Sequence, residues 1–95
     1  MQVIQRKKLQ ALMLDCRQPM EVTFQKKDGK WKAIKGEVEY VKGHNNFNPA
    51  AHMGKYVTLV IDRQTNPQWR NVSLETVSHI NIGMDKYSVE GKLFD

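Results

Sequence analysis

Apolar residues near the start of the chain repeat with a helical period. They fall at i, i+3, i+4 and i+7, so one face of a helix would carry all of them. These residues are Leu9, Leu12, Met13 and Cys16. Pro19 ends the pattern, because proline cannot continue a helix and disfavours helical geometry in the residue before it. The pattern predicts an amphipathic helix over about residues 4–16, which would close one end of a β structure.

Beyond the proline the period changes to 2, which is typical of strands. Val22 and Phe24 alternate with polar neighbours. The Asp-Gly pair at 28–29 then predicts a tight hairpin, since glycine accepts a positive φ. The return strand spans about residues 31–41, and Gly36 within it indicates a bulge or a sharp bend.

Three more strands are predicted at residues 56–61, 68–74 and 78–82, with one 3₁₀ turn over residues 75–77 between the last two. The nearly continuous apolar run at 56–61 is typical of a central strand buried on both faces. The tail, residues 84–95, either adds a short strand or stays loose.

These elements predict a single domain over residues 1–95. It is mainly β, a small five-stranded SH3-like barrel over about residues 19–82, with the N-terminal helix at about 4–16 and the tail at 84–95. Closing the sheet removes exposed strand edges, which a small β protein must protect. An edge left open by incomplete closure would instead pair two chains, so a homodimer is an open alternative.

Basic residues are concentrated in the first third of the chain. The whole chain holds 15 Lys and Arg against 10 Asp and Glu, a net charge of +5. Residues 1–35 hold nine of the basic and three of the acidic residues, a net of +6, and the rest carries −1. A concentrated positive field attracts polyanions, so we expect nucleic acid or an acidic protein face as the partner. A lysine-rich surface that only maintains solubility is the alternative.

The chain lacks the residue spacings that catalytic and metal sites need. No Cys-x₂-Cys or His-x₃-His pair occurs among its soft or borderline metal ligands. Those ligands are Cys16, His44, His52 and His79. No nucleophile-elbow pattern surrounds Ser73 or Ser78, and no glycine-rich phosphate loop occurs. The sequence predicts a non-catalytic protein with no metal and no cofactor.

Cysteine content and hydropathy bear on the compartment. A single cysteine cannot form a disulfide within its own chain, so nothing calls for an oxidising compartment. No apolar run approaches the ~18 residues of a membrane span, and no secretory signal is expected. We expect a cytoplasmic protein with no membrane partner.

The hairpin near residues 28–29 and the loop at 42–54 carry side chains suited to unpaired RNA. Ammonium groups neutralise phosphates, aromatic rings stack on bases, and asparagine amides read base edges. The candidate nucleic-acid-binding residues are Lys26, Lys27, Lys30, Trp31, Lys32, Lys35, His44, Asn45, Asn46, Phe47 and Arg70. Arg70 would project outward as Trp69 points inward. In the alternatives, Trp31 packs inside the barrel while the lysines solvate its rim, and the asparagines serve turn geometry alone.

Two segments resemble a known family. The segment Glu21-Val-Thr-Phe-Gln-Lys-Lys-Asp-Gly-Lys-Trp-Lys and the segment Trp69-Arg-Asn-Val-Ser-Leu-Glu-Thr-Val-Ser-His-Ile-Asn-Ile are similar to the Sm-like, SH3-type barrels related to WYL domains. Small proteins of this kind occur in tailed bacteriophages. Over about residues 19–82 the resemblance implies a five-stranded barrel that binds nucleic acids or nucleotide-like ligands, or docks on proteins. The Trp-Tyr-Leu triplet of the WYL group is absent, so no binding residue is carried over.

Charge, aromatic content and resemblance together predict a binding protein for RNA or another single-stranded nucleic acid. A phage origin implies a host-takeover or counter-defence factor that acts in the host cytoplasm and restrains a host toxin or nuclease. The alternative is an inhibitor that docks its basic face on an acidic surface of a host enzyme. Its aromatic anchors would be Phe47, Tyr87 and Phe94.

Overall fold

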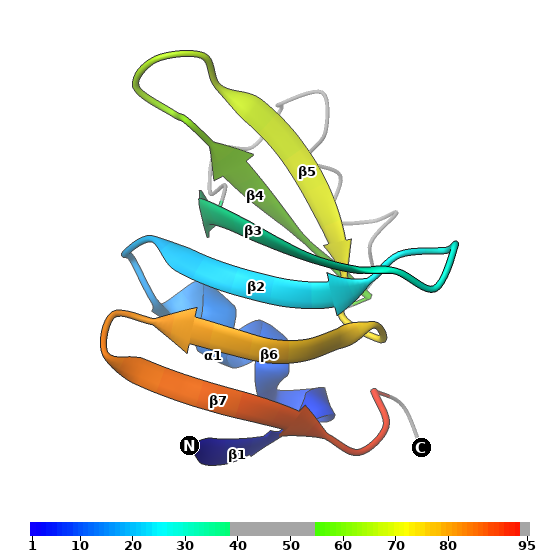
Figure 1. Ribbon diagram of the computed structural model, residues 1–95. Coiled ribbons are helices and arrows are strands. Elements are labelled where there is room, and N and C mark those ends of the chain that lie inside the picture. The colour runs from blue at the N-terminus through cyan, green and yellow to red at the C-terminus, as the bar shows by residue number, and fades with distance from the viewer. Residues whose placement is uncertain (39–54, 94–95) are drawn as a thin grey trace.

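The chain folds into one curved sheet with a short helix packed on one face (Figure 1). The computed structural model describes residues 1–38 and 55–93. The strands are β1 (Gln2–Gln5), β2 (Met20–Gln25), β3 (Trp31–Val38), β4 (Tyr56–Ile61), β5 (Gln68–Ser73), β6 (Val77–Ile82) and β7 (Asp85–Glu90). A 3₁₀ helix, Arg6–Lys8, leads directly into α1 (Leu9–Asp15). Within the described ranges, neither helix has the length and apolarity to cross a membrane.

The sheet has seven strands in the order β1-β7-β6-β2-β3-β4-β5 and is open, with β1 and β5 at its ends. The mainly β architecture with a helix near the N-terminus is therefore confirmed, whereas the prediction of a closed five-stranded barrel is wrong. The five predicted strands are present as β2 to β6. The chain then turns back at Gly83, whose φ of +59° suits a tight turn. As a result β7 pairs with the edge of β6 that faces away from β2. A closed barrel would need that same edge to be free for pairing.

The predicted helix over residues 4–16 is correct only in its second half. The first residues form β1, which pairs in parallel with β7, and the next three form the 3₁₀ helix. Residues 2–5 form a strand and not a helix because β7 supplies hydrogen-bonding partners for their backbone. Backbone polar groups that leave water need such a partner. On α1 the predicted apolar stripe does face the core. Leu9 and Met13 are fully buried there, and the other two stripe residues are partly buried against them.

The core lies between α1 and one face of the sheet. Alternate residues of the central strands point to this face, among them Val22, Ile34, Leu59 and Ile80, all buried. The opposite face of the sheet is called the outer face below. At β4 both faces are buried, since Val60 is as inaccessible as Leu59. The predicted burial on both faces is thus confirmed for residues 57–60, although β4 lies next to the end strand β5 and is not central in the sheet.

Strand β3 changes partners at Gly36. Up to this residue it pairs with β2, and from Glu37 it pairs with β4. A Cβ atom on Gly36 would lie 2.6 Å from the backbone oxygen of Val60, closer than such atoms can approach. Glycine is therefore required where the sequence predicts a bend, because β3 and β4 come too close there for any side chain.

The guanidinium of Arg6 joins three parts of the chain. Its Nε donates to the backbone oxygen of Gly91 at 2.9 Å, and its Nη1 donates to those of Leu74 and Val77 at 2.8 and 2.6 Å. These carbonyls flank the β5–β6 turn and follow β7. Arg6 therefore connects the N-terminal segment to both, although in the sequence it is only one of the nine basic residues among residues 1–35.

Candidate nucleic-acid interface

The β2–β3 hairpin presents the largest group of predicted site residues. The Lys26 amide donates to the Lys30 oxygen at 2.8 Å, and the Gly29 amide donates to the Lys26 oxygen at 2.9 Å. Gly29 has a φ of +88°, and the Asp28 side chain accepts from the Lys30 amide at 2.9 Å. The predicted Asp-Gly turn is thus confirmed. These bonds fix the backbone from which three exposed lysines project.

Trp31 begins β3 and lies opposite Gln25 on the outer face. Because side chains alternate along a strand, Trp31 shares this face with Lys35, while Ile34 and Gly36 face the core. The indole is 59% exposed. Trp31 is therefore not packed inside the fold, which was the alternative left open by the sequence.

The five hairpin lysines do not form one uniform surface. Lys26, Lys27 and Lys30 are exposed at the tip, where Lys26 Nζ lies 3.9 Å from Asp28 Oδ2. Both members of that pair are about half exposed, so the attraction between them is weak. Lys35 lies on the outer face with Trp31. Lys32 lies on the opposite face of β3 from Trp31 and Lys35, because it is two residues from Ile34 and side chains alternate along a strand.

Arg70 lies apart from the hairpin. It belongs to β5, two strands from β3 in the sheet, and lies opposite Leu59. Its guanidinium donates to the backbone oxygen of Trp69 and to the Gln68 side chain. Arg70 is exposed, as predicted, but the predicted inward orientation of Trp69 is wrong. Trp69 lies opposite Val60, on the face away from the core, because β5 pairs with β4 in a register that gives the core side to Arg70.

The remaining predicted residues, His44, Asn45, Asn46 and Phe47, lie outside the described residues. The interface that the described part of the chain brings together therefore consists of the hairpin tip, Trp31 and Lys35. We call it the hairpin surface.

The outer face continues from the hairpin surface across β2 and β6. Thr23 lies opposite Ala33 on one side and His79 on the other. His79 is exposed, and its Nδ1 lies 2.9 Å from Ser78 Oγ. The β6 alternation, with isoleucines on the core side, gives the signal that places His79 outward. The result is an open strip of small and polar side chains that leads away from Trp31.

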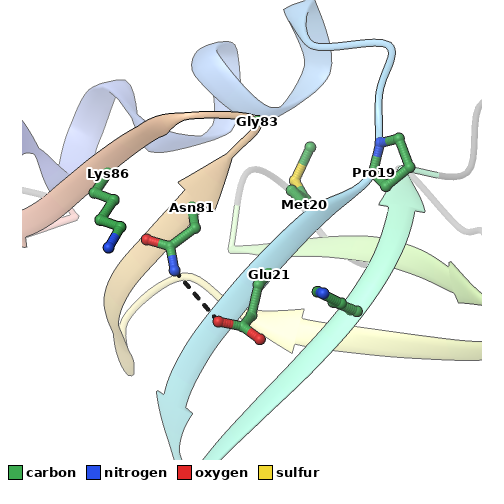
Figure 2. A pocket seen from close by; sticks show the side chains of 7 residues that line it. Pro19, Met20, Glu21, Asn81, Gly83 and Lys86 are labelled. Carbon is green, nitrogen blue, oxygen red and sulfur yellow. Dashed lines mark hydrogen bonds between the residues drawn. The ribbon is translucent and has the colours of Figure 1, made fainter.

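The next row of the strip crosses four strands. Glu21 lies opposite Lys35 and Asn81, and Lys86 lies opposite Asn81. The Asn81 amide donates to Glu21 Oε1 at 3.3 Å (Figure 2). These residues line a shallow hollow, completed by Pro19, Met20 and Gly83. Sequence reasoning missed the hollow, because Lys86 enters it only through β7.

Comparison of the chain with protein-family models, with curated proteins and with solved structures gives no match. Across residues 1–38 and 55–93, no three His, Cys, Asp or Glu side chains gather in a way that would hold a metal ion. The Sm-like resemblance therefore stays a prediction.

Proposed function

We propose that this protein binds single-stranded nucleic acid, RNA foremost, without catalysis, through the hairpin surface. The observation that carries the proposal is the 59% exposure of Trp31 beside a lysine-bearing turn. An indole in contact with water at a position that packs on nothing in the core adds little to folding. Stacking on a base would remove it from water, and the ammonium groups beside it are placed to meet the phosphates.

Each group has a separate part in this binding. The lysines release counterions from the phosphates, which gives affinity that falls with salt and depends little on sequence. Trp31 contributes about 1–3 kcal/mol for each base that stacks on it. Lys35 lies four residues further along the outer face, about 13 Å from Trp31 at strand spacing, and so provides a second phosphate contact. A single strand is favoured over a duplex, because only unpaired bases expose their faces to an indole.

The rival function, a protein-binding inhibitor, has less support. Of its three expected anchors, Tyr87 is partly buried against the core, and Phe47 and Phe94 lie outside the described residues. A phage counter-defence role, a host toxin or nuclease as target, a homodimer and a cytoplasmic location stay predictions from the sequence.

A charge-reversal pair tests the proposal. The variant Lys27→Glu/Lys30→Glu changes the hairpin tip, and Lys7→Glu/Lys8→Glu makes the same change in net charge at two exposed positions of the 3₁₀ helix. Binding of a labelled U20 RNA is followed by fluorescence anisotropy at 50 and 200 mM salt. We expect the tip variant to lose at least about tenfold in affinity and much of the salt dependence, and the control to lose far less. Equal losses in both variants would show attraction by net charge alone and refute the site.

A further inference from the structure

The hollow on the outer face holds a carboxylate in an otherwise basic setting. Glu21 is partly buried, and Lys35 and Lys86 stand one and two strands away in the same row. Among the described residues, Glu21 makes no ion pair, and its recorded partner is the amide of Asn81. A carboxylate accepts hydrogen bonds and donates none, so Glu21 selects a ligand with N–H groups.

The free nucleobases differ in how they meet such a carboxylate. Guanine offers two adjacent donors, N1–H and N2–H, which match the two carboxylate oxygens. Uracil offers one N–H between two carbonyl oxygens, and adenine and cytosine offer an amino N–H beside a ring nitrogen that repels the carboxylate. On the Watson–Crick edge, guanine alone among the four common bases makes both bonds.

We propose that the hollow binds an unpaired guanine, with the Glu21 carboxylate on its N1–H and N2–H. This inference rests on the proposed function and gives it a base preference. The Asn81 amide holds the carboxylate in place through its bond to Oε1 (Figure 2). Lys35 and Lys86 flank the site with donors for guanine O6 and for the phosphates beside it, and Pro19 adds an apolar wall.

The charge distribution excludes the simpler occupant, a free phosphate. Glu21 stands between the two lysines in the row, so an anion seated among them would meet a negative charge at the centre. A base avoids this conflict, because it places N–H groups at the carboxylate and leaves the phosphates to the lysines. The hollow lies on the same face as Trp31, so one strand can occupy both.

Three labelled RNAs test the preference without any change to the protein. The oligonucleotides are (UUG)₄, (UUA)₄ and (UUI)₄, where inosine keeps N1–H and O6 but lacks the N2 amino group. We expect (UUG)₄ to bind about tenfold more tightly than (UUA)₄ in anisotropy titrations, with (UUI)₄ between them. Equal affinity for all three would overturn the guanine site and leave the proposed function standing. Failure of all three to bind would overturn both.

A matched pair of variants assigns the preference to one residue. Glu21→Gln removes one acceptor and the charge, whereas Glu90→Gln makes the same change at an exposed position of β7 outside the hollow. We expect Glu21→Gln to bind (UUG)₄ and (UUA)₄ equally, with the affinity for (UUA)₄ at or above that of the wild type. Glu90→Gln should keep the tenfold preference. A preference that survives Glu21→Gln would refute the assignment.

Discussion

At the scale of single residues, neighbours of the same type have different roles. Arg6, Lys7 and Lys8 form one basic run in the sequence, yet Arg6 donates to three backbone carbonyls while both lysines are exposed. The acceptors of Arg6 lie 68 to 85 residues away along the chain. No local pattern reveals contacts of that range, so the sequence does not distinguish Arg6 from the other basic residues of the first third.

Arg6 should therefore matter for stability more than for binding. We expect Arg6→Ala to lower the free energy of unfolding by about 2–4 kcal/mol, because three carbonyls lose a charged donor. Urea unfolding followed by circular dichroism measures the change. Lys7→Ala, which removes the same charge next to it, should cost less than about 0.5 kcal/mol. Equal effects would show that the Arg6 bonds contribute nothing beyond charge.

Asp28 has two separable roles at the hairpin tip. Its Oδ1 accepts from the Lys30 amide, and its Oδ2 lies 3.9 Å from the Lys26 ammonium. Asp28→Asn keeps an acceptor for the turn and removes the negative charge. We expect it to raise the affinity for U20 RNA about two- to fivefold with little change in stability. A weaker affinity with an intact thermal transition would contradict the role of the tip in binding anions.

At the scale of elements, alternation in the sequence predicted β2 to β6 within one or two residues over the described ranges. The strand at 56–61 is confirmed at both ends. β1 was not predicted, because it is only four residues long and pairs with a strand from the opposite end of the chain, and β7 was only one of two alternatives for the tail. The exposure of Trp31 could be predicted from the same alternation, since Trp31 and Lys35 are four residues apart and so lie on the same face of β3. The hollow could not be predicted, because one of its residues, Lys86, belongs to β7.

The change of pairing partner at Gly36, where β3 leaves β2 and joins β4, gives a prediction for this element. We expect Gly36→Ala to destabilise the fold by about 1–3 kcal/mol, because its Cβ would press on the Val60 carbonyl 2.6 Å away and separate β3 from β4. Lys35→Ala, at the adjacent exposed position, is the control for urea unfolding and should cost far less. Unchanged stability in Gly36→Ala would mean that the two strands are not in close contact.

At the scale of the whole molecule, the two ends of the chain complete the sheet together. β1 pairs with β7, β7 pairs with β6, and Arg6 donates to the carbonyl of Gly91, just after β7. This mutual dependence replaces the barrel closure expected from the sequence. It also brings Lys86 onto the outer face, so the hollow is complete only when β7 is paired with β6.

Removal of residues 84–95 should therefore affect the entire fold. The deletion exposes the edge of β6, leaves β1 without its partner strand and removes the buried side chain of Val89 from the core. We expect a loss of cooperative unfolding, or a midpoint in urea far below that of the full chain, measured by circular dichroism. A truncated chain with the full chain's midpoint would show that the tail is an accessory strand only.

The central claim is that an exposed indole on a basic hairpin binds unpaired bases, and Trp31 tests it most directly. The measurement is the dissociation constant for labelled U20 RNA of the wild type, Trp31→Phe and Trp31→Ala, with Met84→Ala as a control at another exposed apolar side chain. We predict a loss of about 10- to 100-fold for Trp31→Ala, a smaller loss for Trp31→Phe and none for Met84→Ala. A Trp31→Ala protein that is folded and binds U20 as tightly as the wild type would contradict the account.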